Sequence, residues 1–430
     1  MKDKFRLLAI ETSCDETAAA VIDFDIKSMV IKPLSSVVFS QIDIHKKFGG
    51  VYPELASREH IKKILPIVEE AARKAQVISD KCLVSSEKSP ITNHLSPITD
   101  IDAIAVTTGP GLIGSLIVGV EFARGLAMAL NKPVIPVNHL EGHIYANFIG
   151  VNSKFQITNN KQILNSKNKN SKHVCDLELG ACDLPPKIEF PILSLVVSGG
   201  HTMLVLMKKH LDYQIIGTTL DDAAGECFDK IARMLGLPYP GGPALEKLAR
   251  DGNPKAYDFP RAMIKSDNYD FSFSGLKTAV FYKLRSLGLV DSNAEPIRKS
   301  KILNLKSIKC DIAASAQKAI IDVLVAKTLR AAADFNVKSI LVGGGVSANS
   351  QLRAAFTSSS VIPSRAEGSH SGDNFGTFGH HSGANYKIYL SPTELATDNA
   401  LSIAIAAAYH LQNSDTTSWQ NLYADASLRL

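Results

Sequence analysis

The stretch that decides the fold is residues 5–17, Phe-Arg-Leu-Leu-Ala-Ile-Glu-Thr-Ser-Cys-Asp-Glu-Thr, which the apolar residues 18–22 follow. A second stretch has the same pattern: apolar residues 192–197, a small polar turn over 198–202, and apolar residues 203–207. Each predicts a strand, a polar turn and a second strand, a hairpin whose backbone amides and hydroxyl groups can face a phosphate. This repeat predicts two related lobes with a cleft between them.

The composition is that of an ordinary globular protein. The chain has 430 residues, of which 45% are hydrophobic and 21% charged, so it can build two domain-sized cores and is not disordered throughout. The formal net charge of +5 permits an anionic partner such as RNA but does not by itself indicate one. The six cysteines form no Cys-x-x-Cys pair, which predicts reduced thiols and neither a zinc ribbon nor a disulfide framework.

The start of the chain predicts a cytoplasmic protein. The strand-like residues 5–10 come directly after Met1-Lys2-Asp3-Lys4, which leaves no room for a signal peptide. The longest apolar stretches are shorter than a helix that spans a bilayer, so we expect no membrane segment.

Between and after the two hairpins, the spacing of apolar residues predicts further helices and strands. Residues 54–72 carry apolar side chains at helical spacing, with a kink expected at Pro66. Residues 101–106 predict a buried strand, which leads through a glycine-rich turn into a helix over 116–130. Near the end, residues 400–411 predict a long apolar helix.

Three segments read as insertions, residues 85–96, 152–184 and 358–385. They are rich in polar residues and have no clear core-forming period, which predicts surface loops. The third contains His370, His380 and His381, but histidines in such a loop are more often incidental than metal ligands. We predict no site there.

Two histidines four residues apart, His139 and His143, would share one face of a helix and could bind one metal ion. The spacing resembles the zinc-protease motif, but Glu141 lies about 200° around the helix from His139, so a protease base is not supplied. From these residues alone, an interpretation as two ordinary histidines on a helix beside a core is equally good.

A carboxylate late in the chain, Asp398, precedes the helix predicted at 400–411. Local sequence favours a helix N-cap at this position. As a third ligand beside His139 and His143, however, Asp398 would complete a 2-His-1-carboxylate set suited to iron(II), with zinc as the alternative.

Several glycine-rich and acidic clusters could border a nucleotide. Residues 109–119, 198–200 and 343–349 would expose backbone amides, although each cluster alone is weak evidence. Asp221 and Asp222 could cap the helix that follows them, whereas Asp229 is harder to explain as a cap.

Taken together, these motifs resemble the TsaD family of tRNA N6-adenosine threonylcarbamoyltransferases, formerly described as O-sialoglycoprotein endopeptidases. The resemblance covers about residues 5 to 410 apart from the insertions. The motifs that carry it occur in order along the chain, at residues 11–17, 53–58, 109–112, 139–143, 197–202, 221–230, 239–243, 271–278, 343–349 and 397–399.

The resemblance implies an α/β, two-lobed actin-like ATPase fold, shared with sugar kinases and Hsp70, with duplicated core subdomains. On this fold we expect lobe I over residues 1–138, lobe II over 139–398, and a C-terminal segment, 399–430, that packs back on lobe I. The implied reaction moves the threonylcarbamoyl group of threonylcarbamoyl-AMP to N6 of the adenosine 3′ of the anticodon, in tRNAs that read codons beginning with A.

The resemblance also implies roles for individual residues. His139, His143 and Asp398 correspond to metal ligands for one Fe²⁺, or Zn²⁺, per subunit, while Asp15 and Glu16 correspond to catalytic acidic residues near the phosphate. The residues implied to bind the adenylate are Val196, Val197, Ser198, Gly199, Gly200, Asp229, Gly242 and Asn349. The implied fold places Asp229 and Asn349 on opposite lobes. This chain has Glu246 where many relatives have an aspartate, which puts one ribose contact in doubt.

Because the adenylate is an activated mixed anhydride, direct transfer is expected, with Cys14 as a packing residue and not an acyl carrier. The implied partners are tRNA, threonylcarbamoyl-AMP, and TsaB-like and TsaE-like proteins. Three alternatives stay open at this stage: an ATPase or small-molecule kinase of the same fold, a non-catalytic scaffold of the TsaB kind, and a metalloprotease. The histidine pair argues against the first two, and the misplaced Glu141 against the third.

Overall fold

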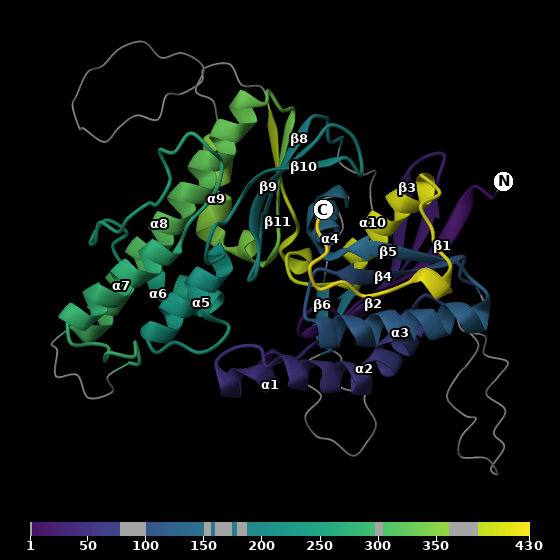
Figure 1. The fold of residues 1–430 in the computed structure, drawn as a ribbon, viewed down its shortest axis with the longest axis horizontal. Coiled ribbons are helices and arrows are strands. Elements are labelled where there is room, and N and C mark those ends of the chain that lie inside the picture. The colour runs from purple at the N-terminus through teal and green to yellow at the C-terminus, as the bar shows by residue number, and fades with distance from the viewer. Residues whose placement is uncertain are drawn as a thin grey trace. The chain divides into compact units, whose positions relative to one another are not determined.

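The computed structural model describes residues 2–77, 100–149, 156–159, 174–178, 187–296, 304–360 and 386–430. The chain forms two compact units (Figure 1). Unit 1 comprises Met1–Lys187 and Pro392–Leu430, and unit 2 comprises Ile188–Ser391. The chain therefore leaves unit 1 once and returns to it for its last segment.

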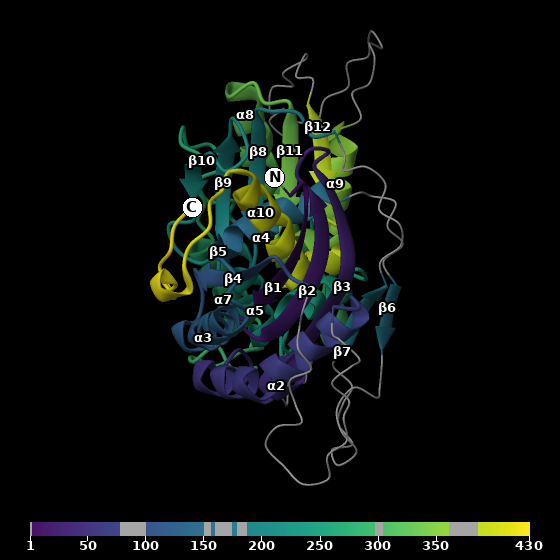
Figure 2. The same cartoon turned by 90° about the vertical axis from the view of Figure 1, so that its right-hand side faces the viewer.

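A mixed seven-stranded sheet forms the centre of unit 1, in the order β5-β4-β1-β2-β3-β7-β6. Strands β1, β2 and β3 are antiparallel neighbours, whereas β4 runs parallel to β1 and β5 parallel to β4 (Figure 2). The strands are β1 Lys4–Glu11, β2 Glu16–Asp25, β3 Val30–Ser40, β4 Ala103–Gly109, β5 Val134–Asn138, β6 Gln156–Asn159 and β7 Val174–Glu178.

Helices cover both faces of this sheet, which explains the continuous apolar runs in its strands. On one face, Leu8 and Ile10 pack in a core with α2 and α3. Successive side chains of a strand alternate between faces, and α10 contacts β1, β2, β3 and β5 on the other side. The helices of unit 1 are α1 Ile42–His45, η1 Lys46–Phe48, α2 Pro53–Lys74, α3 Ile113–Leu130, α4 His139–Tyr145, η3 Ala146–Phe148, η5 Thr393–Leu395, α10 Ala400–Gln412 and η6 Trp419–Asn421.

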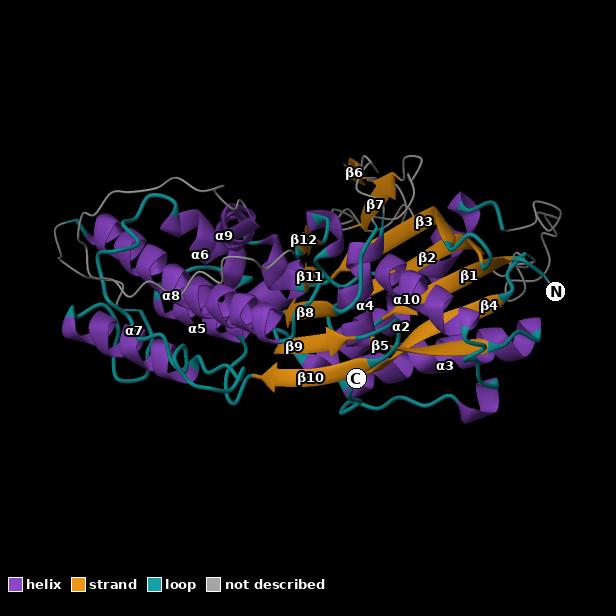
Figure 3. Ribbon diagram, turned by 90° about the horizontal axis from the view of Figure 1, so that it is seen from above, coloured by secondary structure: helices purple, strands orange, loops and turns teal. Residues whose placement is uncertain are grey.

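Unit 2 repeats the central pattern of unit 1. Its five-stranded sheet has the order β10-β9-β8-β11-β12 (Figure 3), in which β8, β9 and β10 are antiparallel neighbours and β11 and β12 run parallel to β8. In both units the third, second, first, fourth and fifth strands lie in that spatial order. The elements are β8 Ile192–Val197, β9 Thr202–Met207, β10 Tyr213–Thr218, α5 Ala224–Met234, α6 Gly241–Ala249, α7 Ser274–Ser286, α8 Leu305–Asp334, β11 Ser339–Gly343, η4 Gly345–Ala348, α9 Ser350–Ser360 and β12 Lys387–Leu390.

The repeated strand order confirms the predicted fold, a two-lobed α/β architecture of the actin-like ATPase type with duplicated cores. The predicted hairpins are β1–β2 and β8–β9, and the helix predicted at 54–72 is α2, which continues through Pro66. The boundary between the units differs from the predicted one after residue 138. It lies after Lys187 and again after Ser391, because α4 contacts β5 and α10 and so belongs to unit 1.

Part of the predicted insertion at 152–184 extends the first sheet. Strands β6 and β7 pair with each other, and β7 adds to β3 beside Val37, Val38 and Phe39. Such short strands have too few residues to show an apolar period, so the sequence did not predict them. The insertion at 85–96, the remainder of 152–184 and residues 361–385, with their three histidines, lie outside the described residues.

Helix α3 contradicts the prediction that every apolar stretch is too short to span a bilayer. It has 18 residues with a mean hydropathy of 1.6, which is long and apolar enough to cross a membrane by length and composition only. A core helix meets the same criteria, and Val120, Ala123 and Ala127 of α3 pack in the core of unit 1.

Two glycines of α3 test how closely this helix packs on the first hairpin. A Cβ atom at Gly119 would lie 2.3 Å from Thr12 Oγ1, whereas one at Gly125 would meet nothing within 4 Å. We expect Gly119→Ala to lower the free energy of unfolding by about 1–3 kcal/mol through overpacking. Gly125→Ala should raise it by about 0.5–1 kcal/mol, because alanine favours a helix. Urea denaturation measures both, and equal effects would contradict the close contact.

Candidate functional site

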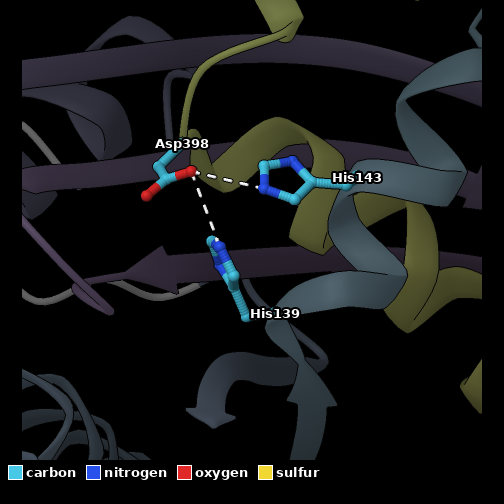
Figure 4. Close-up of side chains that lie close together, drawn as sticks. All are labelled: His139, His143 and Asp398. Carbon is cyan, nitrogen blue, oxygen red and sulfur yellow. Dashed lines mark ion pairs between the residues drawn. The ribbon is translucent and has the colours of Figure 1, made fainter. Parts of the chain in front are cut away.

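Helix α4 and the residue before α10 bring the three predicted metal ligands together in unit 1. Asn138 caps α4 by accepting a hydrogen bond from the Leu140 amide, so the helix begins at His139. One helical turn separates His139 from His143, and their Nε2 atoms each lie 3.6 Å from Asp398 Oδ1 (Figure 4). All three side chains are largely buried. The predicted triad therefore exists as a spatial cluster.

The alternative interpretation of Asp398 as a helix cap is wrong. The N-cap of α10 is Asn399, whose Oδ1 accepts a hydrogen bond from the Ser402 amide at 2.9 Å. The Asn399 side chain also donates to Leu395 O and Thr397 O, which fixes the turn before the helix. Because Asn399 takes the capping role, the Asp398 carboxylate faces the two histidines.

The second nitrogen of His139 is held by a buried carboxylate that sequence reasoning did not assign to the site. Nδ1 lies 3.1 Å from Ser13 Oγ and 3.4 Å from Oε2 of Glu11, which is 1% exposed. Glu11 in turn accepts hydrogen bonds from Thr107 Oγ1 and the Ser13 amide. A carboxylate behind a ligating histidine orients the ring and leaves Nε2 for a metal. Glu11 lies inside the quoted first motif, but only the fold shows its contact with residue 139.

The carboxylates at this site favour a positively charged group beside them. Burial disfavours the imidazolium of His139, but Asp398 and Glu11 outweigh burial and raise its pKa to about 9. Burial opposes ionisation of Glu11, but His139, Ser13 and Thr107 outweigh it and lower the Glu11 pKa to about 2. Burial raises the pKa of Asp398 to about 6. Two carboxylates thus surround one imidazole, and either a proton or a metal ion can balance them.

The donor set fits a divalent transition metal. The ligand atoms of His139, His143 and Asp398 all lie within 4.8 Å of one another, and no other such group of three was found among the described residues. Two donors on one ion at about 2.1 Å lie about 3–3.5 Å apart, close to the observed 3.6 Å. Two histidines and one carboxylate leave coordination positions open, an arrangement that suits iron(II) and that zinc also adopts.

Glu141, between the two histidines, has a structural role. Its Oε2 accepts a hydrogen bond from the Asn138 amide at 3.1 Å, which completes the capping box of α4. The same oxygen lies 2.9 Å from Nε2 of His410 near the end of α10. The Glu141 carboxylate therefore joins α4 to α10.

The two predicted catalytic acids lie beside the triad. Asp15 and Glu16 are 7% and 8% exposed, and the charge of Asp15 acts on Asp398. Burial, with Asp15 and Asp398 nearby, raises the Glu16 pKa well above its ordinary value. Burial also raises the pKa of the neighbouring Cys14 thiol well above its ordinary value, which disfavours a nucleophilic thiolate and fits a packing role.

The predicted adenylate-binding residues gather in unit 2, where the parallel strands β8 and β11 end. Val196 pairs with Gly343, so the loop of Ser198, Gly199 and Gly200 begins beside the glycine-rich turn that ends at Asn349. Gly199, Gly200 and Gly242 have no heavy atom within 4 Å of an added Cβ, whereas Gly225 approaches Ser198 O. The backbone of Gly199 and Gly200 is therefore accessible, and the start of α5 packs against Ser198.

Three polar side chains tie these loops together. Asp229 on α5 accepts a hydrogen bond from the Gly242 amide at 3.0 Å, at the start of α6. Asn349 accepts from the Gln351 and Leu352 amides and donates to Gln317 Oε1, so it caps α9. Glu246 accepts from the amide and hydroxyl of Ser350.

Two expectations for this part of the chain are corrected. Asp229 and Asn349 do not lie on opposite lobes, because both belong to unit 2, where Phe228 and Leu352 share one core. Asp221 does not cap the helix that follows it. Its carboxylate accepts hydrogen bonds from the Phe273 and Ser274 amides at the start of α7. The core shared by Phe228 and Leu352 and the hydrogen bonds of Asp221 to residues 273 and 274 each join segments that are distant in sequence, which local patterns do not reveal.

The repeated strand order and the triad together define a class: α/β proteins of the actin-like ATPase fold with a candidate metal site. A model of the TsaD family, tRNA N6-adenosine threonylcarbamoyltransferase, matches residues 32–83, 91–157 and 166–405. The chain belongs to this family.

Curated relatives with that name cover nearly the whole chain. One from Moorella thermoacetica is 41% identical over 409 residues, 95% of this chain and 93% of the relative. One from Clostridium kluyveri is 41% identical over 431 residues, 100% of this chain and 99% of the relative. One from Bacillus subtilis is 41% identical over 405 residues, 94% and 90% of the two chains. The match to the family model breaks at two of the predicted insertions and runs through the third, residues 358–385.

The link between α4 and α10 predicts a pH dependence of stability. His410 contacts Glu141 through Nε2 and Asp415 through Nδ1. Burial lowers its pKa, but the two carboxylates outweigh burial and raise the pKa to about 8. Because the unfolded value is about 6.5, the ion pairs stabilise fully below pH about 6.5 and lose about 1–2 kcal/mol as pH rises through 8.

Chemical denaturation at pH 6 and pH 9 measures this contribution, with His410→Gln as the matched variant. We expect the wild-type protein to lose more of its free energy of unfolding between the two pH values than His410→Gln does. An equal loss in both proteins would mean that His410 does not carry the effect.

Proposed function

We propose that the chain transfers the threonylcarbamoyl group of threonylcarbamoyl-AMP to N6 of the adenosine 3′ of the anticodon, in tRNAs that read codons beginning with A. Membership of the tRNA N6-adenosine threonylcarbamoyltransferase family supports the reaction and the tRNA substrate. The single structural observation that carries the proposal is the triad of His139, His143 and Asp398, with Glu11 behind it. An ATPase or kinase acting on its own is not favoured, since such enzymes hold magnesium with carboxylates.

In this reaction N6 of adenosine attacks the carbamoyl carbon, the bond from that carbon to the phosphate oxygen breaks, AMP leaves, and N6 loses a proton. His139, His143 and Asp398 would hold one Fe²⁺, or Zn²⁺, which when bound stabilises negative charge that develops on the substrate. Glu11 and Ser13 orient His139. Asp15 and Glu16, beside Asp398, are our candidates to receive the proton.

The adenylate would bind to the loops of unit 2. The backbone of Gly199 and Gly200 is accessible, and Val196 and Val197 anchor that loop in the sheet. Asp229 and Gly242 are already joined by a hydrogen bond, and Asn349 ends the neighbouring turn. Bare backbone amides at strand ends and helix starts are suited to a phosphate and a nucleoside.

We also propose that the protein works in the cytoplasm with TsaB-like and TsaE-like partners. The tRNA substrate of the family supports this location. Tests of activity should therefore combine the purified chain with both presumed partners, synthetic threonylcarbamoyl-AMP and unmodified tRNA, with the nucleosides read by mass spectrometry.

The metal assignment predicts the outcome of ligand removal. His139→Ala and Asp398→Ala should each lose stoichiometric metal and form no modified nucleoside, because two remaining donors bind a divalent ion weakly. His210→Gln, a histidine of unit 2 outside the triad, serves as the control and should keep both. Metal analysis and the nucleoside assay measure the two effects. Unchanged metal content in the triad variants would contradict the assignment of these residues as metal ligands.

The adenylate assignment predicts separate effects on two ligands. Asn349→Ala should weaken threonylcarbamoyl-AMP binding about tenfold or less, the cost of one hydrogen bond. Its tRNA affinity, governed mainly by salt-dependent contacts to phosphates, should hardly change. Asn349→Ser keeps an uncharged oxygen that can cap α9 and removes the amide that donates to Gln317, so it separates loss of the amide from loss of the cap. Direct titrations that show full adenylate affinity but weakened tRNA binding in both variants would reverse the assignment.

A further inference from the structure

A buried polar network in unit 1 surrounds His60 of α2, which has no exposed surface. Its Nε2 lies 3.0 Å from the Cys14 carbonyl oxygen and its Nδ1 lies 2.8 Å from Thr17 Oγ1. A carbonyl oxygen can only accept, so Nε2 carries the hydrogen and Nδ1 accepts from the Thr17 hydroxyl. Burial also lowers the pKa of His60, which keeps the ring neutral in this tautomer.

The main chain that His60 contacts is held at three successive carbonyl groups. The Ser13 carbonyl accepts from the Leu112 amide at 2.8 Å. The Cys14 carbonyl accepts from His60 Nε2 and, at 3.3 Å, from Ser115 Oγ. The Asp15 carbonyl accepts from the Gln41 amide at 3.0 Å. The side chain of His60 is thus one of the anchors that fix the backbone of residues 13–15.

This backbone segment carries the groups that surround the triad. Ser13 contributes its hydroxyl to His139 Nδ1 and its amide to Glu11. Asp15, two residues further, acts on Asp398 through its charge. A rotation of the Cys14 peptide would therefore move both groups relative to the triad, although His60 itself touches none of the three ligands in any described contact.

A second group of buried polar residues, Gln41 and His45, adjoins the His60 ring. Gln41 donates to Ala56 O and lies 3.5 Å from the His60 ring nitrogens. Its Oε1 accepts from His45 Nε2, and His45 Nδ1 accepts from the Tyr52 amide. Both His45 and Gln41 are fully buried. Gln41 and His45, which precede α2, therefore restrict the position of the His60 ring.

We propose that His60 is a positioning residue for threonylcarbamoyl transfer, which fixes the Ser13–Asp15 backbone so that Ser13 and Asp15 keep their places beside the triad. This inference rests on the proposed function. His60 is not a catalytic residue, because it is fully buried and both of its ring nitrogens are engaged within the chain.

Three variants test the proposal in the reconstituted transfer assay. His60→Leu removes both hydrogen bonds, whereas His60→Gln keeps an amide donor for the Cys14 carbonyl. Ile67→Ala, on the same helix, is the control for lost stability, since Ile67 is buried in the apolar core and forms none of the hydrogen bonds to residues 13–15. Each variant is measured at a temperature where unfolding curves show that it is folded.

We expect His60→Leu to lower kcat about 10- to 100-fold, as a displacement of about 1 Å at a reacting centre does. The KM for tRNA should stay within about twofold, because the lost interaction does not bind tRNA. His60→Gln should recover most of kcat, and Ile67→Ala should keep it. Equal kcat values for His60→Leu and Ile67→Ala, or no recovery in His60→Gln, would overturn the proposal.

A spectroscopic measurement separates this proposal from the proposed function. Co²⁺ added to each protein reports ligand geometry through its visible absorption. A changed Co²⁺ spectrum in His60→Leu, with an unchanged one in Ile67→Ala, supports the positioning role even if the wild-type protein forms no modified nucleoside. Identical spectra in all variants would overturn it. If the wild-type protein is inactive but the Co²⁺ spectrum of His60→Leu still differs from those of the wild type and Ile67→Ala, only the proposed function is contradicted.

Discussion

The packing of α10 against the first sheet and α4 is the constraint on which the candidate metal site depends. Ala404, Ala406, Ala407 and Ala408 are fully buried, and such small side chains let the helix lie close to its neighbours. On α4, a Cβ atom at Gly142 would lie 2.7 Å from Ile403 Cδ1, so glycine permits the approach. This close contact carries Asp398, just before α10, to the histidines of α4. The link from Glu141 to His410 adds a charged contact between the same two helices.

The same five-strand order supports different chemistry in the two units. In unit 1 the first hairpin places Glu11 and Ser13 against His139 and Asp15 near Asp398, so charged side chains dominate. In unit 2 the corresponding turn consists of Ser198 and two glycines, so accessible backbone dominates. A buried carboxylate cluster needs a cation to offset the cost of desolvation, whereas bare amides attract an anion. The duplication thus separates a candidate metal site from a candidate phosphate site.

The buried polar groups next to His139 are joined by successive hydrogen bonds. His139 contacts Glu11, Glu11 accepts from Thr107, and the backbone of residues 13–15 is held by α2, α3 and the residue before α1. Each polar group left without such a partner would cost about 1–3 kcal/mol. These hydrogen bonds restrict the arrangement around His139, and a rigid arrangement suits a site whose ligand atoms must keep their spacing.

The sequence by itself determined the duplicated hairpins, the α/β class, the family resemblance and the spacing of His139 and His143, because these depend on local periodicity and on motifs in order. Local pattern could not decide between cap and ligand for Asp398, since Asn399 beside it is an equally good cap. It could not reveal Glu11 behind His139 or His60 behind Cys14, because each pair joins residues far apart in the chain. It also misplaced the unit boundary, because the packing of α4 on α10 decides where α4 belongs. Those choices were made by tertiary contacts, which alone bring distant side chains within hydrogen-bonding distance.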